Sequence, residues 1–163
     1  MTKEAKAEAS QRKKEEKKAK IEQHYKITDT LLEGKRFVLE AHFLRYSNGT
    51  RVDVVPTLNF ISVDSLTAVL QLGSMHRVGF NGVGGVTVQG RILNWKFVKD
   101  DKQKNFYITL TVQGNIDIYD ISMSIDYEGY AEATISGVNT GRFTFIGNIV
   151  SKKETVIFKG QTQ

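Results

Sequence analysis

Residues 31–44, LLEGKRFVLEAHFL, contain a change from a helical to a strand pattern of apolar residues. Upstream of Gly34, apolar residues recur at spacings of three and four, which is the period of one face of an α-helix. From Phe37 to Phe43 the pattern repeats at every second residue instead, which is the period of a β-strand. The sequence therefore predicts a helix that ends near Gly34. We expect Gly34 at the C-cap with a positive φ, because glycine adopts that conformation without strain.

The first 33 residues form a charged arm. From Thr2 to Lys20 the only apolar side chains are alanines, set among strong helix formers. This part has nothing to bury, so we expect it to be exposed, and its start can be disordered. The helix can break at the β-branched pair Ile27-Thr28. A stripe at helical spacing predicts the end of the arm that docks on the body, and it consists of Ile21, Tyr25, Thr28, Leu31 and Leu32.

The rest of the chain, residues 34–163, is predicted to be one antiparallel β domain. Asn48-Gly49 between two alternating runs is a strong hairpin signal. Pro56 has no N–H to donate, so the strand that contains it should be an edge strand or carry a bulge. That return strand is predicted from four apolar residues, Val52, Val54, Leu58 and Phe60.

Further strands follow without any helical pattern between them. Trp95 is in phase with Leu93 and Phe97, which predicts that all three side chains face the core. Val156–Phe158 can add a last strand. Roughly eight to ten short strands joined by turns indicate an all-β fold, either an antiparallel β-sandwich or a partly closed barrel.

Composition and charge exclude several classes of protein. A chain of 163 residues without cysteine has no disulfide, thiol nucleophile or cysteine-ligated metal. More than half of the net charge of +5 lies in residues 1–24. The β domain is close to neutral, so we expect no specific nucleic-acid binding. Weak attraction of the arm to an anionic membrane surface remains open.

No catalytic or metal-binding constellation stands out. His24, His42 and His76 fall in three different predicted elements without metal-ligand spacing. No serine lies in a nucleophile elbow. Four carboxylates lie close together in sequence, and we interpret them as surface groups: Asp117, Asp120, Asp126 and Glu128. We therefore expect no catalytic residues, no metal and no cofactor.

A glycine-rich stretch, residues 79–85, is the most unusual local feature. It lacks the Gly-Lys-Ser/Thr ending and the following helix that a phosphate-binding loop requires. We expect a turn-rich loop at one end of the β domain. If this loop contacts a ligand, the polar groups available are His76, Arg77 and Asn81.

Several segments together resemble a family from Bacteroidetes that is known only as domain of unknown function 4251. The resemblance rests on the stretch 31–41, the turn Asp64-Ser65-Leu66, the end of the glycine-rich stretch at Gly84-Gly85-Val86, and the runs 130–135 and 143–149. It covers roughly residues 20–150. The resemblance implies a secreted protein of the periplasm or cell envelope, although members usually carry a signal segment before the arm. It implies no activity and gives no residue a role.

Our functional expectation is a non-catalytic β-domain of the cell envelope that binds an unidentified protein partner or a small ligand. One alternative is a lipocalin-like barrel that carries an apolar ligand, which would need an internal cavity of several hundred Å3. A less favoured alternative is an enzyme whose catalytic residues are dispersed along the sequence.

Overall fold

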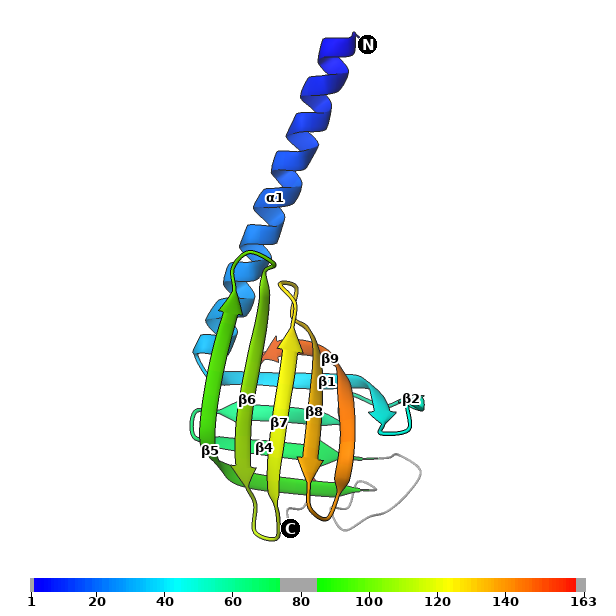
Figure 1. The fold of residues 1–163 in the computed structure, drawn as a ribbon, viewed down its shortest axis with the longest axis vertical. Helices are drawn as coiled ribbons and strands as arrows, with labels where there is room; N and C mark the ends of the chain where they lie inside the picture. Colours follow the sequence, from blue (N-terminus) through cyan, green and yellow to red (C-terminus); the bar gives the residue numbers. More distant parts are fainter. Residues whose placement is uncertain (1, 74–84, 161–163) are drawn as a thin grey trace.

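The computed structural model describes residues 2–73 and 85–160. A long helix leads into a closed β-barrel, as Figure 1 shows. The helix is α1 (Lys3–Glu33), and its first half projects from one end of the barrel. Nine strands follow in the described part of the chain: β1 (Arg36–Tyr46), β2 (Arg51–Asp53), β3 (Phe60–Asp64), β4 (Thr67–Leu72), β5 (Val86–Asp100), β6 (Asn105–Gln113), β7 (Ile118–Ile125), β8 (Tyr130–Gly137) and β9 (Gly141–Ser151).

The barrel closes because β9 pairs back onto β1. The strand order is β1-β3-β4-β5-β6-β7-β8-β9, every neighbouring pair is antiparallel, and β2 adds to the far half of β1. Eight strands therefore form a closed antiparallel barrel, and β2 is an extra strand. Of the two architectures that the sequence left open, the barrel is the one observed.

Helix α1 is continuous from Lys3 to Glu33, so the break predicted at Ile27-Thr28 is absent. Its N-terminus is capped by Thr2, whose hydroxyl accepts a hydrogen bond from the backbone N–H of Ala5 at 3.2 Å. The prediction for Gly34 was wrong in one respect. Gly34 keeps a helical φ of −67°, and the next residue, Lys35, takes the positive φ of 53° that reverses the chain.

Three strand predictions also need correction. The return strand through Pro56 is two strands, because the chain leaves the sheet after β2 and turns before β3, where the N–H groups of Leu58 and Asn59 both donate to Val55. Val156–Phe158 form no strand and cross the outside of the barrel. Leu93 is exposed, because the register of β5 on β6 shifts by one residue there and returns the alternation to the core at Trp95.

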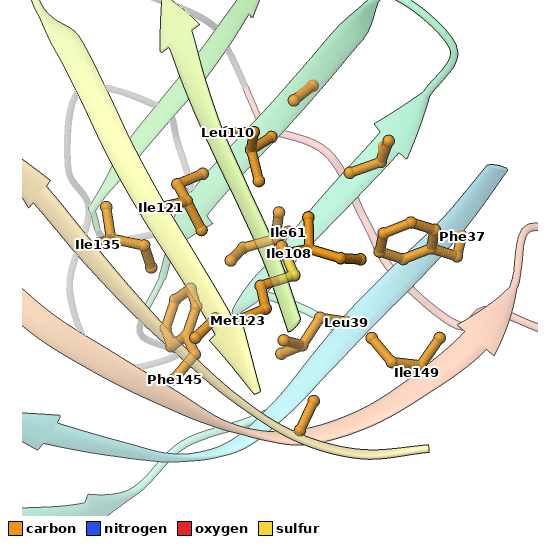
Figure 2. Packing of buried hydrophobic residues seen from close by; sticks show 14 of the residues in the cluster. Phe37, Leu39, Ile61, Ile108, Leu110, Ile121, Met123, Ile135, Phe145 and Ile149 are labelled. Atoms are coloured by element: carbon orange, nitrogen blue, oxygen red, sulfur yellow. The ribbon is translucent and has the colours of Figure 1, made fainter. Parts of the chain in front are cut away.

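The barrel interior is filled by side chains (Figure 2). These side chains come from every strand of the barrel, and they include Phe37, Leu39, Ile61, Ile108, Leu110, Ile121, Met123, Ile135, Phe145 and Ile149. The docking end of α1 covers one end of this core. Tyr25, Thr28 and Leu32 are buried as predicted, and the Tyr25 ring stacks on Phe106 with 4.8 Å between the centroids.

Candidate functional site

The end of the barrel that lies away from α1 is the mouth. It is formed by the β6–β7 turn, the β8–β9 turn, the last residue of β4 and the first residue of β5 (Figure 1). A small apolar cavity of about 20 Å3 opens there. Its walls include Leu72, Val86, Tyr119, Ile135 and Phe143. About one water molecule fits into such a volume.

Apolar side chains project from the two turns of the mouth. Val138 of the β8–β9 turn is 89% exposed, and Ile116 of the β6–β7 turn is 68% exposed. Ile118, at the start of β7, is also exposed. Isolated exposed apolar residues are ordinary on a protein surface, but these three lie on adjoining turns. We call these three exposed side chains, Ile116, Ile118 and Val138, the apolar rim of the mouth.

Asp117 joins the two turns. Its carboxylate accepts hydrogen bonds from the backbone N–H groups of Ile118 at 2.8 Å, Asn139 at 2.9 Å and Val138 at 3.4 Å. These backbone donors, that of Asn139 above all, lower the pKa of Asp117 below its ordinary value. The interpretation of Asp117 as a surface carboxylate was wrong, since the residue is buried against the neighbouring turn that its charge holds in place.

Because of the hydrogen bonds that Asp117 accepts, we expect the free energy of unfolding to fall in acid. Because folding lowers the pKa of Asp117, its contribution to stability is present above the unfolded pKa and is lost as the pH falls below about 4. Asp117→Asn should therefore lower the free energy of unfolding near neutral pH and flatten its decline between about pH 5 and 2. Urea unfolding of both proteins across this range measures the effect. Asp120→Asn is the control, because among the described residues that carboxylate accepts a hydrogen bond only from the Thr111 hydroxyl, and an equal flattening there would contradict the prediction.

The other three carboxylates of the predicted surface group stay near the surface. Asp120 and Glu128 are exposed, and Asp126 is half-buried. Asp126 accepts from the backbone N–H groups of Glu128 and Tyr130 in the β7–β8 turn. These contacts shape the turn, so Asp126 serves the fold.

The sequence-predicted ligand residues His76, Arg77 and Asn81 lie outside the described residues. The strands that flank them end at Leu72 and begin at Val86, and both of these residues line the mouth. Of the other histidines, His24 lies on α1 and His42 on β1, and both are exposed. Within residues 2–73 and 85–160, no group of three or more histidine or carboxylate side chains is arranged to hold a metal ion.

The opposite end of the barrel holds α1 in a fixed orientation. The Tyr25 hydroxyl donates to Asp101 in the β5–β6 turn at 2.5 Å, and Thr28 donates to the Tyr127 carbonyl at 2.8 Å. Burial, together with the Asp101 carboxylate, raises the pKa of Tyr25 to about 12. Lys99 forms ion pairs with Asp29 and Glu33 of the helix. The arm is thus attached by hydrogen bonds and ion pairs as well as by its apolar stripe.

The projecting part of α1 is polar. Within residues 2–73 and 85–160, no helix has both the length and the hydropathy needed to cross a membrane.

Comparisons with known proteins agree on one family. The family model described as domain of unknown function DUF4251 matches residues 19–149. A crystal structure of a DUF4251 family protein from Bacteroides eggerthii is similar over 81% of this chain and 90% of that one, with 27% sequence identity and a TM-score of 0.68. No curated protein matches this chain. Because the family model spans most of the sequence, the chain belongs to the DUF4251 family of unknown function.

Proposed function

We propose that this chain is a non-catalytic binding module of the cell envelope, in which α1 is a spacer and the mouth of the barrel contacts a protein partner. One observation carries the proposal: the charged arm and the apolar rim lie at opposite ends of the same barrel (Figure 1). If the arm is attached to a membrane surface, the mouth at the opposite end therefore stays accessible to a protein partner.

The dimensions of the arm support a role as a spacer. With 31 residues, α1 is about 46 Å long at ~1.5 Å per residue. Its buried residues begin only at Tyr25, so the first half of the helix stands clear of the barrel. Clustered lysine and arginine residues on that half favour weak attraction to an anionic membrane surface. Residence in the periplasm or cell envelope is part of the proposal, and family membership together with the Bacteroides relative supports it.

Packing of the interior favours surface binding over transport of an apolar ligand. Large side chains from all around the barrel occupy its centre (Figure 2), and the cavity at the mouth has room for about one water molecule. A lipocalin-like carrier needs several hundred Å3 of enclosed space. The apolar rim, by contrast, needs only a complementary surface on a partner.

Crosslinking at single positions in living cells tests the proposal. A photo-reactive amino acid at Val138 or Ile116, introduced in the native organism, should give one adduct of defined mass. The same amino acid at Tyr107, on the exposed wall of the barrel, should give roughly tenfold less of it, because contact is confined to the mouth. Fractionation of the same cells should recover the adduct with the envelope. Equal adducts at Tyr107 and Val138, or recovery from the cytosol, would contradict the proposal.

A further inference from the structure

The C-terminal segment, residues 152–160, crosses the outside of the barrel over β1, β3 and β4. The Glu40 carboxylate of β1 accepts hydrogen bonds from the Thr155 hydroxyl at 2.7 Å and the Val156 N–H at 3.0 Å. Farther along, the Phe158 N–H donates to the Thr57 carbonyl at 2.7 Å. The segment is therefore bonded to the barrel wall at several points.

Gln71 of β4 fixes the end of this segment. Its side chain is buried on the outer face, and its amide group donates to the carbonyls of Leu58 at 3.2 Å and Phe158 at 2.7 Å. Its amide oxygen accepts from the Thr87 hydroxyl at 2.8 Å and the Gly160 N–H at 2.7 Å. All four hydrogen-bonding positions of the amide are occupied. Two of these bonds hold Phe158 and Gly160 of the segment against β4.

A cavity of about 330 Å3 lies between this segment and the outer face of β3 and β4. Its volume corresponds to roughly eleven water molecules at ~30 Å3 each, which is within the range of small-molecule sites. Phe60 and Val69 from the strands and Ile157 from the segment supply apolar walls. The cavity is on the opposite side of β4 from the mouth, so it is a separate site.

The charged groups of the cavity favour an anion. Lys152 and Lys159 line it, together with one carboxylate, Asp64. Asp64 is already paired with Arg36 at 3.6 Å and with Lys152 at 3.7 Å. Lys159 donates to a neutral acceptor, the side-chain oxygen of Gln89, so its positive charge is not neutralised by that contact.

Ser62 supplies a neutral polar group to the cavity. This residue of β3 is only 4% exposed and lines the cavity. Its hydroxyl makes no hydrogen bond within residues 2–73 and 85–160. This hydroxyl is therefore available to donate a hydrogen bond to a ligand in the cavity.

We propose that this cavity binds a small organic anion whose carboxylate or phosphate group contacts Lys152, Lys159 and Ser62, and whose apolar body lies on Phe60, Val69 and Ile157. Lysine recognises both kinds of head group as a point charge, so the two share one chemistry here. Binding of an anion in this cavity does not depend on whether a partner is bound at the mouth.

Titration followed by amide NMR tests the site with three probes: phenylacetate, phenyl phosphate and the neutral phenylacetamide. At least one anionic probe should shift the amide signals of Thr67–Val69 in β4, whereas phenylacetamide should bind at least tenfold more weakly, because it lacks the charge. A comparison of the two anions tells which head group the site prefers.

Variants locate the binding. Lys159→Gln should weaken the binding of the anionic probe about tenfold, and Ser62→Ala should weaken it several-fold, since each loses one contact to the head group. Lys153→Gln is the matched control, because it removes the same charge from the same segment at an exposed position outside the cavity wall. Its affinity should change less than twofold.

Three results would overturn the proposal. One is the absence of shifts with both anions at concentrations up to about 10 mM, the weak end of affinity for ligands of this size. Another is equal binding of phenylacetamide. The third is an equal loss of affinity in Lys159→Gln and Lys153→Gln, which would mean that the anion responds only to the overall charge of the segment.

Discussion

Gly147→Ala is expected to lower the free energy of unfolding by about 3 kcal/mol or more, because it forces apart the two strands that close the barrel. Gly147 lies in β9 and pairs with Ala41 of β1. A Cβ atom added to Gly147 would stand 1.8 Å from the backbone oxygen of Glu40 and 2.9 Å from the Cα atom of Ala41. Both atoms belong to the backbone, so no side-chain rotation relieves the overlap.

The local structure of β1 explains the close approach at Gly147. The register between β1 and β9 shifts at His42, where β1 has one residue more than its partner. Such a bulge bends the strand and increases its twist, which brings the Glu40 carbonyl over Gly147. On the other side, Gly147 pairs with Ala131 of β8, another small residue. The three strands can therefore come together only around a residue without a side chain.

Gly141→Ala is the matched control in the same strand. Gly141 has a φ of +70°, but a Cβ atom there would meet nothing within 4 Å. Alanine at this position should cost only about 1 kcal/mol, from backbone conformation alone. Urea unfolding of the two variants, followed by the fluorescence of Trp95, measures the difference. Equal losses of stability would mean that close approach of the strands is not what Gly147 provides.

The fold could be predicted from the sequence wherever the signal is local. The spacing of Tyr25, Thr28 and Leu32 identifies the buried face of the helix, since residues three or four apart lie on one side. The Asn48-Gly49 hairpin was also predicted correctly, and Gly49 has the positive φ of 90° that the turn requires. These features depend on residues close together in the sequence, so they can be predicted from one sequence alone.

Predictions from local sequence patterns failed where a β-bulge adds one residue to a strand and where a neighbouring residue takes the expected conformation. A strict period of two places Leu93 on the same face as Trp95, but the bulge in β5 reverses the alternation between them. At the end of the helix, glycine was the expected residue for the positive φ, yet Lys35 takes it. Its ammonium group lies 5.1 Å from the centre of the Trp95 ring, a contact between segments far apart in sequence. A contact of this kind is visible only in the tertiary structure.

The sites escaped prediction because their parts are distant along the chain. Ser62 and Lys159 meet at one cavity although nearly a hundred residues separate them, and neither stands in a motif. Asp117 was interpreted as one of several surface acids, because the backbone N–H groups that donate to it from the β8–β9 turn are brought near it only by strand pairing. Gly147 did carry a usable signal: an isolated glycine inside a strand pattern often marks close backbone approach.

Leu32→Ala is expected to lower the free energy of unfolding by about 3 kcal/mol, the usual cost of removing a buried leucine side chain. Leu32 is on α1, yet it has no exposed surface and belongs to the same apolar cluster as Phe37 and Phe106 of the barrel. Ile27→Ala on the same helix is the control. That side chain is 55% exposed, so its truncation should cost less than about 1 kcal/mol.

Two probes decide whether helix and barrel unfold together in this variant. Helical circular dichroism reports on α1, and Trp95, the single tryptophan, reports on the barrel near Phe37, whose ring centroid is 6.4 Å away. Because Leu32 packs into the barrel core, both signals should shift to lower urea by the same amount. A shift of the helical signal alone would show that the docked part of the arm unfolds independently. The arm would then be a separate unit, and α1 could not fix the direction in which the mouth points.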